Sequence, residues 1–218
     1  TKAFAMRKTI SVFILLCLWL SVDAQSHIAD SLKKLLNDHP QQDTLRVQAL
    51  NSLARELSRG NAKTTDSVLD ISIALSSRIN DQKDKGFALV IKGNVRHNVA
   101  EDSLAYKYYD EAKQLLEKVQ DKKGLAYMYR SRANTLMDDG RHAECLDDFL
   151  KGLKLAQEAG DLKAVIDIQR TIGYFYNVIG EPEKAIHYQS EALKQALSIN
   201  YIPGITGSYN AIGKTNKK

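Results

Sequence analysis

The chain has 218 residues, 44% hydrophobic and 26% charged, a composition ordinary for a soluble globular protein. The formal net charge of +5 sits at the two ends: residues 1–24 carry +2 and Lys214, Lys217 and Lys218 carry +3, which leaves residues 25–213 neutral. A neutral body removes the main electrostatic argument for nucleic-acid binding, which requires a concentrated basic surface.

Residues 1–24 have the layout of a leader with a secretory signal peptide. Two basic residues after Met6 precede an apolar stretch at 10–22, and the segment closes with small or modest residues up to Ala24. The apolar stretch is shorter than the roughly 20 residues that span a bilayer as a helix. We expect translation to start at Met6, cleavage to follow Ala24, and the protein to be exported to the periplasm or cell envelope of a bacterium. An uncleaved membrane anchor is the alternative.

After an expected N-terminal lead-in at 25–42, the sequence repeats with a period of about forty residues. Small residues recur at spacings of 39, 40, 40 and 40: Ala54, Gly93, Ala133, Gly173 and Gly213. Two further small series follow in step, with aromatic residues beside them: Ala105, Cys145 and Ala185; Ala112, Gly152 and Ala192; and Tyr109, Phe149 and Tyr188. Series that stay in step over this length indicate a repeat architecture.

Each repeat is predicted to contain two amphipathic helices. In the fourth repeat, apolar residues at helical spacing occur throughout 162–179. Gly180 ends that helix, and Pro182 stands in the first turn of the next helix. The predicted helices are 44–58, 65–80, 84–99, 102–119, 123–138, 142–158, 162–179, 182–199 and 204–214. Residues 43–202 thus hold four helix pairs, and 203–218 a partial fifth repeat or a capping helix, with truncation of a longer chain left open.

This pattern resembles the tetratricopeptide repeat (TPR) family. Counted from Ile166 as position one, Gly173, Ala185 and Ala192 fill the family's small positions, while Arg132 departs from its usual leucine in the third repeat. The period is longer than the family's usual 34 residues, as in its extended-helix members. The resemblance implies an all-α fold, a right-handed superhelical solenoid of antiparallel helix pairs. The chain also resembles the exported sensor or scaffold regions of bacterial TPR signalling proteins.

No catalytic, cofactor-binding or metal-binding constellation stands out in the sequence. The histidines do not pair with Asp, Glu or Cys at a ligand spacing, and the glycines form no phosphate loop. The acidic pairs Asp138-Asp139 and Asp147-Asp148 are interpreted as solvated faces. We therefore expect a protein that is not an enzyme and has no cofactor and no metal.

The resemblance implies a concave groove lined by fixed positions of the first helix of each repeat. The candidate peptide-binding residues carried over by register are Asn51, Arg55, Asn94, His97, Asn98, Tyr127, Arg130, Asn134, Arg170, Tyr174 and Asn177. Asparagine can grip a peptide backbone with a donor and an acceptor, and arginine can bind a carboxylate with two parallel hydrogen bonds. A merely solvated face is the alternative.

These observations predict a non-catalytic exported module that binds a protein or an extended peptide, with an anionic ligand as one option. Nucleic acid is not expected as a partner. Membrane contact is expected only through an uncleaved signal or a segment missing downstream. A second hypothesis is the N-terminal sensor region of a larger histidine kinase or helix-turn-helix transcriptional regulator, whose output domain is absent from these 218 residues.

Overall fold

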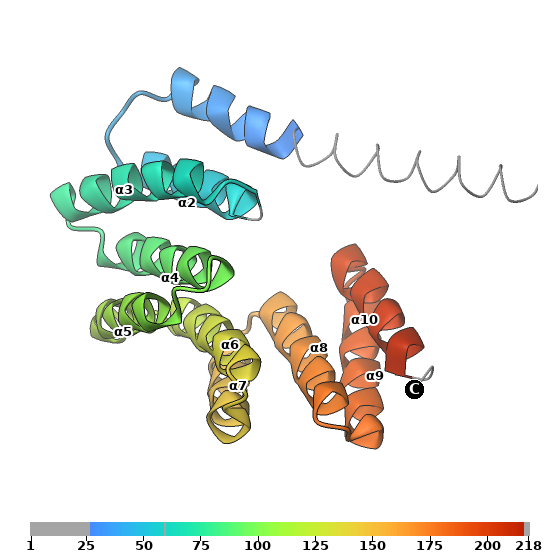
Figure 1. The fold of residues 1–218 in the computed structure, drawn as a ribbon. Helices are drawn as coiled ribbons and strands as arrows, with labels where there is room; N and C mark the ends of the chain where they lie inside the picture. Colours follow the sequence, from blue (N-terminus) through green and yellow to red (C-terminus); the bar gives the residue numbers. More distant parts are fainter. Residues whose placement is uncertain (1–26, 59, 216–218) are drawn as a thin grey trace, which may run out of the picture. The chain divides into compact units, whose positions relative to one another are not determined.

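A computed structural model describes residues 27–58 and 60–215, and every element in these residues is a helix (Figure 1). A helix over residues 27–38 precedes the others. They are α2 (Thr44–Leu57), α3 (Ala62–Arg78), α4 (Gln82–Asn98), α5 (Asp102–Lys118), α6 (Lys122–Asp138), α7 (His142–Glu158), α8 (Leu162–Val178), α9 (Pro182–Ser198) and α10 (Ile202–Thr215). The predicted fold class is confirmed: the protein is all-α, with helices in sequential antiparallel pairs. The predicted signal peptide lies outside the described residues.

The predicted helix boundaries differ from the observed ones by a few residues at most, and one helix was missed. Helix α3 begins earlier than predicted because the Asn61 side chain caps it, accepting a hydrogen bond from the Thr64 N–H at 3.0 Å. The lead-in predicted at 25–42 contains the helix at 27–38. We call α2, α4, α6, α8 and α10 the A helices, and α3, α5, α7 and α9 the B helices.

One turn geometry recurs every twenty residues. The residue at the centre of each turn has φ between 51° and 80°: Asn80, Ala100, Gln120, Gly140, Gly160, Gly180 and Asn200. The N–H of the following residue reaches back to the carbonyl five positions earlier, as from Glu181 to Tyr176 at 2.8 Å, which satisfies a carbonyl at the helix end. The forty-residue repeat therefore consists of two halves of equal length, each a 17-residue helix and a short turn.

The chain divides into two compact units, one ending at Asp84 and one beginning at Lys85, and each is described by itself. In the N-terminal unit, Val47, Leu50 and Leu75 form a buried cluster against which Leu36 packs. The Arg46 guanidinium donates to the Leu36 and His39 carbonyls at 2.7 and 2.8 Å, so the 27–38 helix is tied to α2 by hydrogen bonds as well as by apolar packing.

The core of the C-terminal unit lies between α6, α7 and α8. Its largest members, Phe149 and Phe175, are almost fully buried with ring centroids 6.3 Å apart. Burial of an aromatic side chain of this size contributes about 2–3 kcal/mol. In Figure 1, α8, α9 and α10 lie side by side, with α9 in contact with both A helices.

The small residues that set the register lie where A and B helices approach closely. A Cβ added to Gly93 would lie 2.5 Å from the Tyr109 ring, and one added to Gly173 would lie 2.6 Å from Gln189 Cγ and 3.0 Å from the Ala185 carbonyl oxygen. The interpretation of Gly173 as a packing residue therefore agrees with the structure. A Cβ on Gly213 would meet nothing within 4 Å.

The structure corrects two details of the sequence interpretation. The sequence analysis placed Tyr188 in one series with Tyr109 and Phe149. In the structure the buried residue of that series is Gln189, which is 1% exposed, and Tyr188 instead stacks on Tyr176 with ring centroids 5.6 Å apart. Asp148 was expected on a solvated face but is 2% exposed.

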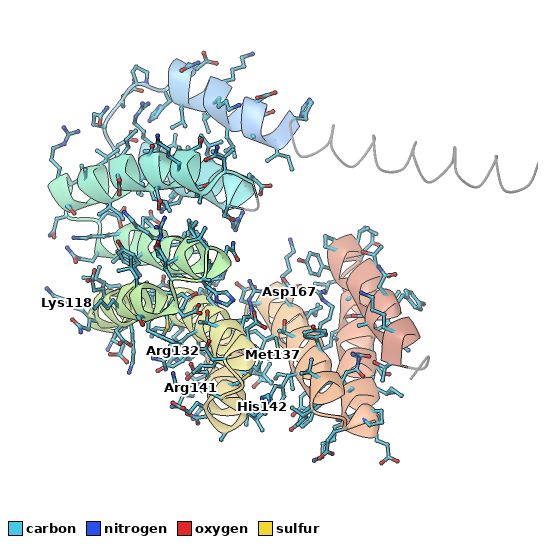
Figure 2. All side chains as sticks on the ribbon, in the orientation of Figure 1. Lys118, Arg132, Met137, Arg141, His142 and Asp167 are labelled. Carbon is cyan, nitrogen blue, oxygen red and sulfur yellow. The ribbon has the colours of Figure 1, made fainter. Side chains whose placement is uncertain are left out.

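Asp148 is buried because Arg132 pairs with it across the α6–α7 hairpin. Arg132 Nε donates to Asp148 Oδ2 at 2.7 Å and Nη2 donates to Oδ1 at 2.9 Å, a two-bond ion pair. These hydrogen bonds raise the pKa of Arg132 above its ordinary value. Figure 2 labels Arg132 and, nearby on the same helix hairpin, Arg141 and His142. The arginine that departs from the family pattern thus has a structural partner one helix away.

Candidate binding surface

The A helices of the C-terminal unit are neighbours of one another. Helix α8 contacts both α6 and α10. Helices α4 and α6 are joined by a hydrogen bond from the Asn94 side-chain amide to the Tyr127 hydroxyl at 3.3 Å. We call the surface formed by the groove positions of α4, α6, α8 and α10 the A-helix face. Among its residues are Phe87, Asn94, His97, Tyr127, Arg130, Asn134, Asp167, Arg170, Tyr174, Asn177, Gly207, Asn210 and Lys214.

An aromatic cluster occupies the part of this face on α4 and α6. The Phe87 and Tyr127 rings have centroids 4.9 Å apart, and the Arg130 guanidinium lies 5.4 Å over Tyr127. Such a cation over a ring is attracted by the ring's quadrupole. Asn94 donates to Tyr127 and accepts from the Tyr109 hydroxyl at 2.9 Å, so both ends of its amide are already bound within the protein.

Asp167 is the centre of a charged cluster on the same face, and Figure 2 labels it towards the N-terminal end of α8. Arg130 Nη1 and Arg170 Nη2 each lie 3.6 Å from a carboxylate oxygen of Asp167. The Tyr201 hydroxyl donates to this carboxylate at 3.3 Å, and burial together with the neighbouring Asp167 charge raises the pKa of Tyr201. At 3.6 Å both arginine contacts are ion pairs without good hydrogen bonds.

A pocket of about 390 Å³ lies between α8 and α10. Helix α8 supplies Arg170, Thr171 and Tyr174, and α10 supplies Gly207, Asn210, Ala211 and Lys214. Two of these side chains are cations and the lining carries no carboxylate. Tyr174 is 52% exposed, so its ring is available to a bound molecule.

Of the predicted groove residues, Arg170 and Tyr174 lie together in this pocket. The others lie outside it and make different contacts. Asn51 is a correction: it is 2% exposed, donates to the Asp84 carbonyl at 2.9 Å and accepts from the Ser72 hydroxyl at 2.6 Å. Its amide therefore holds the N-terminal unit together and lines no groove. Arg55 is exposed on α2 of the same unit.

The other predicted residues of the C-terminal unit fall into two groups. Both ring nitrogens of His97 are bound, Nδ1 to Asp102 at 2.7 Å and Nε2 to Asp138 at 3.0 Å, and Asn98 is exposed. Asn134 and Asn177 are half-buried, and within the described ranges their amides form no side-chain hydrogen bond. These two amides remain open to a ligand backbone.

Five pocket residues were missed by the sequence analysis: Thr171, Gly207, Asn210, Ala211 and Lys214, and three of these follow the groove register. Gly207, Asn210 and Lys214 stand forty residues after Asp167, Arg170 and Tyr174, so each occupies the same register position one repeat later. Extending the groove register into the partial fifth repeat would have found them.

The described residues hold neither a cluster of metal ligands nor a membrane-spanning helix. Between residues 27 and 215, with residue 59 not described, no three His, Cys, Asp or Glu side chains are grouped closely enough to hold a metal ion. Over the same residues no helix has both the length and the apolar character needed to cross a bilayer.

No family model and no curated protein matches the sequence, but solved structures do. A signal-transduction ATPase (STAND) with a tetratricopeptide repeat sensor, from Pyrococcus horikoshii, superposes with a TM-score of 0.71 at 20% identity, covering 90% of this chain and 29% of that one. The chain is a TPR-like helical repeat protein. BtubC (BKLC) from P. vanneervenii gives a TM-score of 0.59 at 14% identity, covering 90% of this chain and 84% of that one.

A Rap protein complexed with Competence and Sporulation Factor is also similar to this TPR-like chain. It gives a TM-score of 0.57 at 11% identity, covering 88% of this chain and 58% of that one. The chain therefore spans under a third of the STAND protein and somewhat over half of the Rap protein. At these identities the likeness concerns the fold, and the sequence resemblance to TPR proteins is supported at that level.

Proposed function

We propose that the chain is a non-catalytic module that binds a protein or an extended peptide through the A-helix face of its C-terminal unit. The observation that carries this proposal is the pocket between α8 and α10, whose cations face no carboxylate in the lining and whose Tyr174 ring is half-exposed. The open amides of Asn134 and Asn177 extend the face on α6 and α8 with donors and acceptors that suit a peptide backbone.

The similar structures support binding as the role of such a fold. One of them, the Rap protein, is described as a complex with Competence and Sporulation Factor, and the repeats of the STAND protein are described as a sensor. A protein that only binds a partner needs a surface complementary to it and no reacting groups. Polar side chains that mostly pair with one another within the protein are compatible with such a role.

Affinity purification tests the proposal, with the tagged full chain as bait. A partner of the A-helix face is expected to be retained by the wild type and lost by a variant combining Asn134→Ala with Tyr174→Ala, since neither side chain forms a hydrogen bond in the described structure. The control is Lys118→Ala, an exposed residue at the end of α5 that Figure 2 labels. If every protein captured by the wild type is also captured by the face variant, the A-helix face is not the binding surface.

Export of the module is a further part of the proposal. It is supported by the signal-peptide layout of residues 1–24 in the sequence. Intact-mass measurement of the protein recovered from the cell envelope is expected to show a chain that begins after Ala24. A mass that retains Met6 would contradict cleavage.

A second role is a sensor region within a longer signalling protein. It is favoured by the similarity to the STAND ATPase, which has a tetratricopeptide repeat sensor and of which the superposed region covers 29%. Reading the genomic frame beyond residue 218 tests it: a kinase or helix-turn-helix domain encoded there would support the sensor role, and a stop codon directly after Lys218 would reject it.

A further inference from the structure

Two arginines occupy the same register position on the A-helix face, and their surroundings differ. Arg130 lies over the Tyr127 ring and 3.6 Å from Asp167, with 27% of its side chain exposed. Arg170 is 37% exposed, yet its Nε is buried without a hydrogen-bond partner, and its one ion pair to Asp167 is 3.6 Å long. A buried donor of a charged group without an acceptor is unfavourable, so the guanidinium is not fully stabilised by its protein contacts. Of the two arginines, Arg170 is the one with a buried donor that has no acceptor.

Gly207 on α10 determines where the Arg170 side chain lies. A Cβ at position 207 would stand 2.8 Å from Arg170 Nη1 and 3.0 Å from its Cδ and Cζ. The absence of a side chain at Gly207 thus lets the guanidinium lie against α10, inside the pocket that Lys214 also lines. The two cations are brought to one cavity by helices from different repeats.

A second hollow, of about 350 Å³, adjoins this pocket. It is lined by Tyr209, Asn210, Gly213 and Lys214, so it shares Asn210 and Lys214 with the first. Tyr209 is 58% exposed, which makes it one of the most exposed large apolar side chains in the described residues. A cationic pocket and an aromatic surface therefore adjoin along α10.

We propose that these adjoining hollows bind an acidic side chain and the apolar or aromatic side chain next to it, both within one extended peptide segment. The carboxylate is bound by Arg170 and Lys214, and the apolar side chain packs against Tyr209. This inference rests on the proposed function and specifies its ligand. An internal segment fits better than a chain end because open amides on α6 and α8 and the second hollow on α10 give contacts on both sides of the carboxylate. A carboxylate is preferred over an amide because charge-assisted hydrogen bonds to guanidinium and ammonium groups are about twice as strong as neutral ones.

The probes are three short synthetic peptides, each an alanine hexamer with two central substitutions. The first has central Glu-Phe with acetyl and amide caps, the second has Gln-Phe with the same caps, and the third has Gln-Phe with a free C-terminal carboxylate. Binding is followed by chemical-shift titration of the ¹⁵N-labelled full chain. The capped Glu-Phe peptide is expected to bind about tenfold more tightly than the capped Gln-Phe peptide, with the largest shifts on α8 and α10; tenfold corresponds to about 1.4 kcal/mol.

Each alternative result overturns the proposal. Equal affinity of the two capped peptides means that the pocket does not recognise a carboxylate. If the Gln-Phe peptide with a free C-terminus binds as tightly as the capped Glu-Phe peptide, the pocket binds a chain end and the internal assignment is wrong. Shifts confined to helices other than α8 and α10 mean that the location is wrong.

Variants test the two cations and the glycine. Arg170→Ala and Lys214→Ala are each expected to remove most of the preference for Glu over Gln, while Lys118→Ala retains it. Gly207→Ala is expected to weaken Glu-peptide binding by displacing the guanidinium while keeping or raising the melting temperature, because alanine favours a helix over glycine. Thr206→Ala, the exposed neighbouring position on α10, is the matched control. If both α10 variants bind alike, Gly207 does not set the position of Arg170 for binding, and that part of the proposal is overturned.

The failure of this inference can be told apart from the failure of the proposed function. A protein partner that depends on Tyr174 and Asn134 but binds equally to wild type, Arg170→Ala and Lys214→Ala would leave the A-helix face as the binding surface and overturn the carboxylate pocket. If no captured protein depends on Tyr174 and Asn134, the proposed function is overturned as well.

Discussion

The turns that follow α4 and α6 allow the cost of a left-handed residue to be measured in one protein. Ala100 and Gly140 occupy the same position in consecutive repeats, with φ of 60° and 72°. Exchanging the two residue types, as Ala100→Gly and Gly140→Ala, should move the stability in opposite directions by similar amounts. No change in core packing accompanies either substitution, since both positions are exposed.

The magnitude follows from the backbone alone. A Cβ added to Gly140 would meet no atom within 4 Å, so Gly140→Ala has no steric cost beyond that of its own backbone. A non-glycine residue in the left-handed region costs about 1–2 kcal/mol. Alanine also lowers the entropy of the unfolded chain, which offsets about 0.4–1 kcal/mol. Gly140→Ala should therefore destabilise the protein by roughly 0.5–1 kcal/mol, and Ala100→Gly should stabilise it by as much.

Thermal unfolding followed by far-UV circular dichroism measures both changes. For a chain of this length, about 0.5–1 kcal/mol corresponds to a shift in melting temperature of roughly 1–4 °C. Gly140→Asn is a control that should lose less than Gly140→Ala, because asparagine tolerates the left-handed region. The double variant should melt close to the wild type, since the sites belong to separate turns. A lower melting temperature for Ala100→Gly, or an unchanged one for Gly140→Ala, would refute this account of the turns.

The other predictions concern the core of the C-terminal unit and use the same melting assay unless stated. Asp148→Ala should cost about 3 kcal/mol by removing the two short hydrogen bonds from Arg132 and leaving it only the 3.3 Å contact with exposed Asp110. The combination of Arg132→Met with Asp148→Leu should recover most of that loss, and no recovery would mean that the pair has another role. Gly173→Leu should cost about 2–3 kcal/mol or more because the Ala185 carbonyl cannot yield as a side chain does, and a wild-type melt would contradict the register. Burial raises the pKa of the Cys145 thiol from its ordinary 9.0 to about 12, so the contribution of the thiol to stability is complete below pH 9 and is lost as the pH rises towards 12. Cys145→Ala should therefore flatten the dependence of the melting temperature on pH over this range. An unaltered slope would rule the thiol out as the source of that dependence.

The fold could be predicted from the sequence because its decisive feature is a spacing. Close approach of A and B helices needs a small residue at a fixed place, and Gly93 and Gly173 mark that place directly. The break between the helices at 84–99 and 102–119 was predicted, but the left-handed backbone of Ala100 within it could not be found in the same way. That backbone conformation is imposed by the helices on either side, and alanine carries no turn signal of its own. The buried Arg132–Asp148 pair was missed because each charge alone is typical of a solvated surface.

The candidate surface could be predicted only in part, and side-chain length explains the difference. Arg170 reaches from its groove position into the pocket, whereas Asn51 at the same position of the first repeat is short and bonds to Ser72 and the Asp84 carbonyl. Register thus locates a Cα, but the partners available nearby decide where the functional atoms lie. The role of Gly207 depends on contact with Arg170 from another helix, which only a structure shows.

The twenty-residue spacing of the turns constrains how such a chain can change in length. Removing one helix with its turn would place an A helix where a B helix belongs, and large side chains would then meet positions that require small ones. Removing or duplicating forty residues, such as 122–161, would keep both the turn geometry and the order of faces. Insertions and deletions in this protein therefore preserve the packing only when they comprise whole helix pairs. Each added pair would contribute one more stretch of A-helix surface.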